Sequence, residues 1–237
     1  TPKDGDLPRL GLRLSAAAQE LGPSFIKFGQ TLSTRPDMVG EQIAVDLGEL
    51  RDRLPPFSAD TARQTIASQL DREVDDIFTS FEDQPVAAAS IAQVHFARVA
   101  DGGHVAVKVL RPGIEEKFER DIDLFLWIAE WMEILQPAMR RLAPVQVVQT
   151  FRKSALAEMD LRLEGAAASE LAENFEGDDT FQVPGVDWSR TQRRVLTTDR
   201  IGGIPISDKR ALAEAGHDSQ RIVRNLIIGF LRQAFRD

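Results

Sequence analysis

Cysteine is absent from the 237 residues of this chain, and histidine occurs only three times. Without thiols the chain has no disulfide, no thiolate nucleophile and no cysteine–zinc site, and a reducing compartment is compatible with it. The histidines, His95, His104 and His217, are scattered without the spacing of metal ligands. The sequence therefore predicts no metal site among these residues.

Basic residues are fewer than acidic ones, 29 against 37, and long apolar runs are missing. The formal net charge of -8 argues against non-specific nucleic-acid binding as the main task, although a local basic patch is compatible with it. No stretch approaches the roughly 20 apolar residues of a membrane-spanning helix. The polar segment at residues 1–6 begins with threonine and is typical of a cut end rather than a signal peptide. The length suits one domain or two small ones.

The segment from Pro85 to Lys108 has an informative local pattern. Two β-rich runs flank Asp101-Gly102-Gly103, and Asp-Gly between such runs predicts a hairpin. The second run carries Lys108 among apolar residues, so this ammonium is exposed, paired or functional, because burying it alone is costly. Val105-Ala106-Val107-Lys108 fits the Val-Ala-x-Lys frame of the phosphate-contacting lysine in a kinase small lobe. Alanines stand in the preceding loop where protein kinases have glycines.

Helices are predicted for most of the first eighty residues. Gly22-Pro23 separates two helical patterns within residues 7–35, and Gly29 inside the second indicates a close backbone approach. From spacing alone, Lys27 and Gln30 lie on the solvated face of that helix. Further helices are predicted over residues 39–54 and after the N-cap candidate Ser58, followed by a helical turn at 74–78 and a strand at 80–86.

A long helix is predicted from Ile114 to about Leu135. Its middle, residues 124–129, is apolar nearly all round, and Trp131 and Met132 follow. One interpretation is a helix buried between two layers of the fold. The other is a surface that meets lipid or a protein partner, because indole rings favour interfaces.

The rest of the chain mixes helices and short strands. One or two helices are predicted within residues 145–175, strands at 181–184 and 194–198, a turn at Trp188-Ser189 between them, and a loop at 201–205. Apolar residues at helical spacing predict a core helix over residues 220–235.

Four signatures, taken in order, resemble the UbiB family of atypical kinase-like proteins, also called aarF-domain or ABC1-type kinases. They are Lys27-Phe28-Gly29-Gln30 for a Lys-x-Gly-Gln motif, residues 87–95 for an alanine-rich nucleotide loop, Val105 to Lys108 for the third-strand lysine, and Glu158-Met159-Asp160 for a Glu-x-Asp motif. The resemblance covers Leu21 to the C-terminus.

The resemblance implies an α+β fold. Its parts would be an N-terminal helical extension at residues 1–79, a kinase-like small lobe at 80–200 with antiparallel sheet, helix C and an inserted long helix, and the start of a truncated large lobe at 201–237.

The resemblance also implies a nucleotide site. Lys108 would pair with the α- and β-phosphates of ATP or ADP and with Glu164, at the place of the helix-C glutamate. Small side chains permit close approach to a nucleotide, but alanine denies the positive φ values that glycine offers. Backbone groups of Thr197 to Asp199 would bind adenine, and the Ser90 hydroxyl either donates to phosphate or belongs to an inert turn. The predicted nucleotide-binding residues are Ala87, Ala88, Ala89, Ser90, Ile91, Ala92, Val94, Ala106, Lys108, Thr197, Thr198 and Asp199.

The same resemblance places the Lys-x-Gly-Gln segment over the active site, which makes Lys27 and Gln30 site residues rather than solvated ones. Glu158 and Asp160 are two residues apart, so one helix cannot point both the same way. One is expected to face Lys27, and the other to turn towards the nucleotide or to cap a helix. The predicted catalytic set is Lys108, Glu164, Lys27, Gln30, Glu158 and Asp160.

A catalytic-loop aspartate with its metal-binding asparagine, and a later Asp-Phe-Gly, do not occur in the sequence. We expect these motifs and the Mg²⁺ ligands beyond residue 237 of a longer parent protein, so this fragment alone would bind nucleotide at most weakly and transfer no phosphate.

The parent would be an ATP-binding kinase-like protein or ATPase that supports ubiquinone (isoprenoid quinone) biosynthesis. It would be cytoplasmic and peripheral at the inner face of a membrane, with membrane lipid or a quinone precursor and quinone-biosynthesis proteins as partners, and no nucleic acid. The alternative is a pseudokinase-like scaffold that binds lipid or quinone precursor without phosphoryl transfer.

Overall fold

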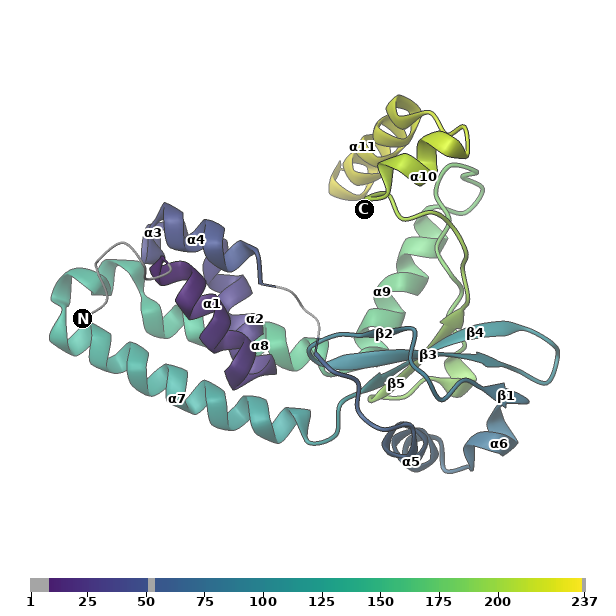
Figure 1. Cartoon of the computed structure of the whole chain (residues 1–237), viewed down its shortest axis with the longest axis horizontal. Helices are drawn as coiled ribbons and strands as arrows, with labels where there is room; N and C mark the ends of the chain where they lie inside the picture. The colour runs from purple at the N-terminus through teal and green to yellow at the C-terminus, as the bar shows by residue number, and fades with distance from the viewer. Residues whose placement is uncertain (1–8, 51–53, 236–237) are drawn as a thin grey trace, which may run out of the picture.

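The computed structural model describes residues 9–50 and 54–235, and a five-stranded antiparallel sheet joins its helical groups (Figure 1). The strand order is β1-β3-β4-β5, and β2 also pairs with β3. The strands are β1 (Ser80–Phe81), β2 (Ala87–Ala88), β3 (Ala92–Arg98), β4 (His104–Leu110) and β5 (Val195–Asp199). The α+β prediction is confirmed.

The predicted hairpin is confirmed as β3 and β4. These strands pair from Ala92 opposite Leu110 to Arg98 opposite His104, and Gly102 in the turn has a φ of 88°, which glycine adopts without strain. Two strand predictions need correction. The strand expected at 80–86 is interrupted, and its ends pair with β3 as β1 and β2. The strand expected at 181–184 is not formed, because Pro184 cannot donate to a ladder and only Val186 bridges to Thr198.

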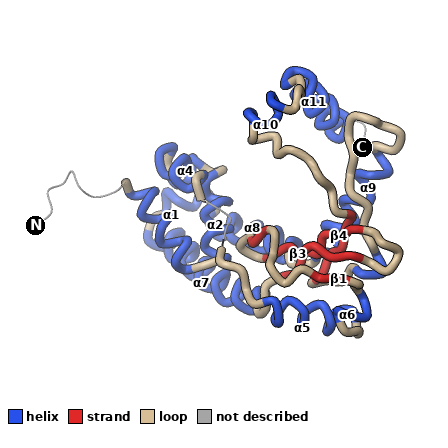
Figure 2. The backbone as a smooth tube through the Cα atoms, turned by 45° about the vertical axis from the view of Figure 1, so that its right-hand side comes forward, coloured by secondary structure: helices blue, strands red, loops and turns tan. Residues whose placement is uncertain are grey.

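The helices fall into three groups (Figures 1 and 2). The helical extension packs with the inserted helices; this group contains α1 (Leu10–Leu21), α2 (Pro23–Ser33), α3 (Pro36–Val39), α4 (Glu41–Gly48), α7 (Ile114–Leu135), the 3-10 helix η1 (Pro137–Leu142) and α8 (Pro144–Glu158). The second group, α5 (Ala59–Leu70) and α6 (Val74–Ile77), lies against the sheet. The third follows α8 and contains α9 (Leu161–Asn174), the 3-10 helix η2 (Trp188–Arg190), α10 (Lys209–Glu214) and α11 (Ser219–Phe235).

An aromatic cluster fixes α2 against the inserted helices. The Phe28 ring stacks on Phe125 of α7 with ring centroids 4.4 Å apart, and it meets Phe151 of α8 at 5.1 Å. Close packing at Gly29 is also present, although its neighbour is a side chain rather than backbone: a Cβ there would lie 2.5 Å from Leu50 Cδ1. The extension that carries Lys27 and Gln30 is therefore held by the inserted helices.

The two faces of the sheet differ. Val105, Val107 and Val109 of β4 point into a core with Ile66 of α5 and Val195 of β5. Because side chains alternate along a strand, the residues between these valines lie on the opposite face, which is half-exposed. The division of the chain at residue 79 remains a prediction, but α5 and α6 pack with the sheet although they precede it in sequence.

Two helix predictions concerned burial, and neither describes the structure fully. The buried face of α7 includes Phe118 and Ile122, yet Trp127 on its other face is 58% exposed, so α7 is not enclosed between two layers. Helix α11 forms as predicted but is not a core helix among the described residues, because Phe230 is 67% exposed and Gly229 is its one buried residue. Periodicity identifies an apolar face but not the surface that covers it.

Candidate functional site

Lys108 and Glu164 form an ion pair between the sheet and α9. The Lys108 Nζ donates to both carboxylate oxygens of Glu164, at 2.9 and 2.7 Å. Lys108 lies on β4 between Val94 of β3 and Leu196 of β5, and Glu164 lies in the first turn of α9. Both side chains remain partly exposed, at 28% and 50%, so the pair faces solvent rather than a dry core. The resemblance predicted this pairing of residues.

The half-exposed face of the sheet brings together several predicted nucleotide-binding residues. Lys108 lies directly opposite Val94, and Ala106 lies opposite Thr198, so all four share one face. Thr197 is on the other face and is fully buried. The side chains of Val94, Ala106 and Thr198 can therefore line a site around Lys108, whereas that of Thr197 cannot.

The alanine-rich segment forms a tight turn between β2 and β3. Ala87 pairs with Val94, Ala88 pairs with Gln93, and the Ala89 N–H donates to the Ala92 carbonyl at 2.8 Å. Beyond Ala89 the side chains turn inward: Ser90, Ile91 and Ala92 are all buried, and Ile91 and Ala92 belong to the hydrophobic core. In this conformation these three residues can meet a phosphate only through backbone groups.

Three of the backbone groups predicted to bind adenine already have partners in a neighbouring segment. The Thr197 N–H donates to Thr191 Oγ1 at 3.2 Å, and the Asp187 N–H donates to the Thr197 carbonyl at 2.9 Å. The Asp199 N–H donates to the Gly185 carbonyl at 2.9 Å. Segment 185–191 thus occupies the outer edge of β5, and adenine contact with these groups requires exchange of these bonds.

Lys27 and Glu158 form a second ion pair, between α2 and α8. Their Nζ and Oε2 atoms are 2.8 Å apart, and Glu158 is the last residue of α8. Gln30 lies one turn along α2 from Lys27. A cavity of about 300 Å³ adjoins the pair, lined by Lys27, Gln30, Thr31, Thr34, Phe151, Ser154, Ala155 and Glu158. The expectation that one acidic residue of the Glu-x-Asp motif faces Lys27 agrees with this geometry.

Asp160, the other acidic residue of that motif, caps α9. Its Oδ1 accepts from the Arg162 N–H at 3.2 Å, and the Arg162 guanidinium binds both carboxylate oxygens, at 2.8 and 2.6 Å. These bonds to Arg162 lower the pKa of the Asp160 carboxyl below its usual value. The cap sits four residues before Glu164, so Asp160 helps to set where the Glu164 helix begins.

Arg111, which the sequence places in a turn, holds the alanine-rich segment in position. Its guanidinium donates to the Ala89 carbonyl from Nε at 3.1 Å and from Nη2 at 2.8 Å, and Nη2 also reaches the Pro55 carbonyl at 3.0 Å. Gln93 ties down the same linker, because its Oε1 accepts from the Phe57 N–H at 3.0 Å. The alanine-rich turn and the linker from the extension are thus held by common side chains. An arginine in the Arg-Pro-Gly turn just after the lysine strand was the available signal.

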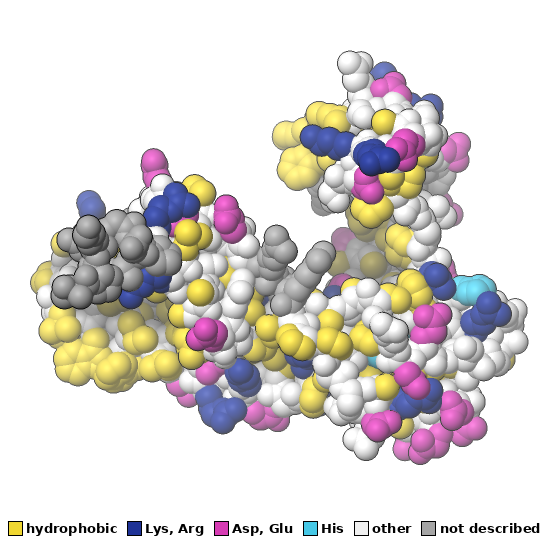
Figure 3. Space-filling model, in the orientation of Figure 1, with side chains coloured by type: hydrophobic (Ala, Val, Ile, Leu, Met, Phe, Trp, Pro, Cys, Tyr) yellow, Lys and Arg dark blue, Asp and Glu magenta, His cyan; other side chains and the backbone are white. Residues whose placement is uncertain are grey.

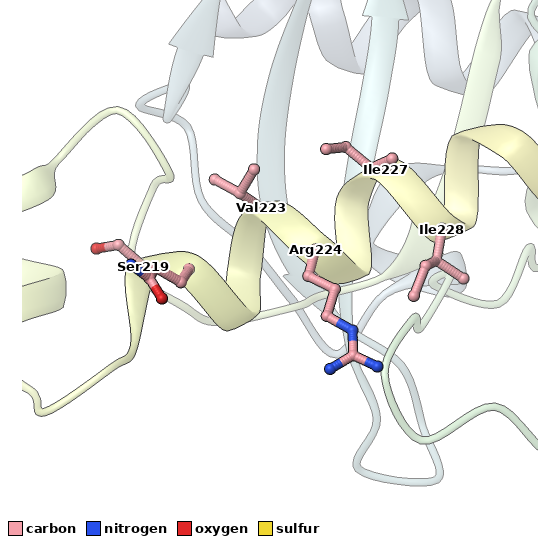
Figure 4. Close-up of a pocket in the computed structure, with 6 residues that line it drawn as sticks. Ser219, Val223, Arg224, Ile227 and Ile228 are labelled. Atoms are coloured by element: carbon pink, nitrogen blue, oxygen red, sulfur yellow. The ribbon is translucent and has the colours of Figure 1, made fainter.

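Another open hollow lies away from these pairs. It has a volume of about 610 Å³ and is lined by α11 alone, with Val223 and Ile227 on one side of the helix and Arg224 on the other (Figure 4). The described part of the chain contains no cluster of three potential metal ligands among histidine, aspartate and glutamate. It also contains no helix long and apolar enough to cross a bilayer.

An antiparallel sheet that presents a lysine to a glutamate on the adjoining helix has the architecture of a kinase-like small lobe, and comparisons with known proteins agree. The model of the ABC1 atypical kinase-like domain matches residues 49–237. The chain belongs to this family.

Proteins named "Probable protein kinase UbiB" from Marinobacter nauticus and Pseudomonas aeruginosa are each 42% identical over 227 residues. The match covers 96% of this chain but 42% and 43% of the two relatives, so the chain spans less than half their length. The structure of the Rv3197–erythromycin complex from Mycobacterium tuberculosis has a TM-score of 0.56 at 29% identity, covering 81% of this chain and 45% of that one.

Proposed function

We propose that this chain binds the phosphates of ATP or ADP at Lys108, as the nucleotide-holding part of a UbiB-type atypical kinase or ATPase. The observation that carries the proposal is the Lys108–Glu164 pair on the half-exposed face of the sheet, beside the alanine-rich turn. Glu164 orients the ammonium, and because the pair is partly exposed a phosphate can reach it. In this scheme the nucleotide supplies the phosphoryl group, while the residues described here bind and orient it.

The site residues fit a nucleotide in chemical terms. Lys108 offers a point charge for phosphate oxygens, and the Val94, Ala106 and Thr198 side chains around it are small enough to admit a ligand. The Thr197 N–H, the Thr197 carbonyl and the Asp199 N–H are already bonded, so we expect the adenine contacts in the loop that leaves β5 after Asp199.

Titration of the protein with Mg-ATP, followed by competition with ADP, tests the proposal. The Lys108→Ala variant is expected to bind ATP more weakly, with little change in melting temperature, because the lysine is a partly exposed side chain. Equal ATP affinity in the wild type and in this variant would exclude Lys108 as the phosphate contact.

The relatives' name also supports a role in ubiquinone biosynthesis for the longer protein. Deletion of the gene should lower the cellular content of isoprenoid quinone, and a Lys108→Ala copy should fail to restore it. Association with the inner face of a membrane and with quinone-biosynthesis proteins belongs to the same proposal.

A second candidate function is binding of a quinone precursor without phosphoryl transfer. The cavity beside Lys27 supports it, because Phe151 and Ala155 give it apolar surface and Lys27 and Gln30 can bind ring oxygens. This function predicts that a soluble short-chain prenylated phenol binds equally to the wild type and to Lys108→Ala. Absence of binding to folded protein would rule it out.

A further inference from the structure

The exposed face of α7 repeats every seven residues. Six large apolar side chains on it are between 42% and 71% exposed: Leu124, Trp127, Ile128, Trp131, Ile134 and Leu135. With Leu124 at position a of a heptad, they occupy positions a, d and e in two successive repeats. We call these six residues the α7 seam. In Figure 3, hydrophobic side chains gather at the lower left, where Figure 1 places the C-terminal half of α7.

The α7 seam is not needed to hold α7 in place. The opposite face of the helix already lies in the hydrophobic core through Phe118, Ile122 and Phe125. On the seam, Trp127 and Trp131 touch each other edge to face, with ring centroids 6.2 Å apart. A contiguous apolar stripe that the fold itself does not use is characteristic of an interaction surface.

Acidic residues run along one edge of the seam. Glu116, Asp123 and Glu130 are seven residues apart, all exposed, and occupy position g. Within the part of the chain that the structure describes, none of the ion pairs involves them. Lys117 and Arg120 fill the preceding a and d positions, which limits the apolar surface to residues 124–135, about 18 Å of helix.

The acidic residues along the seam distinguish between the surfaces that could bind it: a second copy of this chain, a membrane, or a helix of another protein. A second copy packed antiparallel would bring the two acidic g edges together, which is repulsive. A parallel copy would set the g edge against e positions that hold Asp121, Ile128 and Leu135, none of them basic. A membrane rich in anionic lipid would be repelled by the same acids. A helix with basic residues along its matching edge satisfies both the apolar stripe and the charges.

We propose that the α7 seam docks an amphipathic α-helix of another protein, whose apolar stripe is flanked by lysines or arginines. The indole rings of Trp127 and Trp131 are the central anchors, and the acids at position g set the orientation and the choice of partner. The net charge of -8 on the chain assists the approach of a basic partner. The proposal is independent of nucleotide binding at Lys108.

A pair of synthetic probes tests it. One is a dye-labelled three-heptad peptide with leucine at a and d and lysine at e and g, and the other has glutamate in place of every lysine. We expect the lysine peptide to bind the protein at least about tenfold more tightly than the glutamate peptide. Binding should shift the indole emission to the blue. The Glu116→Lys, Asp123→Lys, Glu130→Lys triple variant should reverse the preference.

Substitutions at exposed residues are expected to leave the fold intact and complete the test. Trp127→Gln with Trp131→Gln should abolish binding of the lysine peptide, whereas Val45→Gln, at a 61% exposed site on α4, should leave it unchanged. Equal binding of both peptides, or a preference that the triple variant does not alter, would overturn the proposal. Tighter, tryptophan-dependent binding to phosphatidylcholine vesicles would assign the seam to a membrane instead. A dimer in light scattering that Leu124→Gln dissociates would assign it to a second copy.

Discussion

The two lysine–glutamate pairs of this protein are nearly identical as ion pairs. The shortest nitrogen–oxygen distance is 2.7 Å for Lys108–Glu164 and 2.8 Å for Lys27–Glu158, and the exposure of their lysines is similar, at 28% and 21%. Their surroundings differ. Lys108 projects from a sheet beside a tight alanine turn, whereas Lys27 projects from a helix beside a cavity of mixed polar and apolar lining.

The strength of the ion pair therefore does not distinguish the proposed nucleotide site from the other pair. Partly exposed ion pairs contribute about 0–1 kcal/mol to stability wherever they occur, because solvent screens them. What distinguishes Lys108 is its place on the half-exposed sheet face, next to Val94, Ala106 and Thr198, where we propose that phosphate binds. Asp160 lies between Glu158 and Glu164 in sequence and is the N-cap of α9, the helix that carries Glu164. One short segment of chain therefore connects the two pairs.

The largest expected difference between the pairs is in ATP binding. Lys108→Ala should weaken ATP affinity by roughly 100-fold, because a charge-assisted hydrogen bond to a phosphate contributes about 1.5–3 kcal/mol. Lys27→Ala should change it by no more than about twofold, since Lys27 lies with the cavity between α2 and α8. Isothermal titration of both variants measures the ratio. A similar loss in both would show that the two pairs serve one nucleotide site.

Glycines beside the two pairs offer matched steric tests. Gly165 follows Glu164, and a Cβ there would lie 3.1 Å from the Trp188 ring and 3.2 Å from Leu196 Cδ1; Gly29 is two residues from Lys27 and faces Leu50. Gly165→Val and Gly29→Val should each lower the free energy of unfolding by about 2 kcal/mol through overpacking.

Only Gly165→Val should also weaken ATP binding by the folded protein, because it displaces the helix that carries Glu164. Urea unfolding and ATP titration separate the two effects. Loss of ATP affinity in Gly29→Val would contradict the assignment of ATP binding to the Lys108–Glu164 pair alone.

Removal of the N-cap Asp160, which lies between the two pairs in sequence, should have a smaller effect on stability. Asp160→Ala should destabilise the protein by about 1 kcal/mol, because the first turn of α9 loses its N-cap. The pKa of Asp160 is lowered in the folded state, so its contribution is complete above the ordinary carboxyl pKa of about 3.9 and disappears as the pH falls through the lowered value.

The stability difference between wild type and Asp160→Asn should therefore be constant above about pH 5 and shrink in acid. Urea unfolding at a series of pH values measures it. A difference that grows as the pH falls would contradict the bonding to Arg162.

Local signals predicted the hairpin, the lysine strand and the long helix, because Asp-Gly turns and apolar periodicity act over a few residues. The burial of individual helices and side chains was predicted less well, since it depends on residues that are distant in the sequence. The apolar face of α11 has the pattern of a core helix and yet lies exposed, and Ser90, a candidate phosphate donor, is fully buried beneath its turn.

The link from Arg111 to the Ala89 carbonyl spans 22 residues, and side-chain contacts of that kind have no periodic signature. Site residues on one strand face were therefore easier to anticipate than residues that hold loops.

The smallest stability effects come from exchanging the partners within each pair. Lys108→Glu with Glu164→Lys, and Lys27→Glu with Glu158→Lys, should each leave the free energy of unfolding within about 1 kcal/mol of wild type, because partly exposed pairs tolerate reversal. The exchange of Lys27 and Glu158 should leave ATP affinity unchanged. The exchange of Lys108 and Glu164 should abolish it, because the ammonium would then project from α9 instead of from β4. Urea unfolding and ATP titration measure the two responses. Full ATP affinity after the second exchange would mean that the net charge of the pair, and not the position of Lys108 on the sheet, attracts the phosphates.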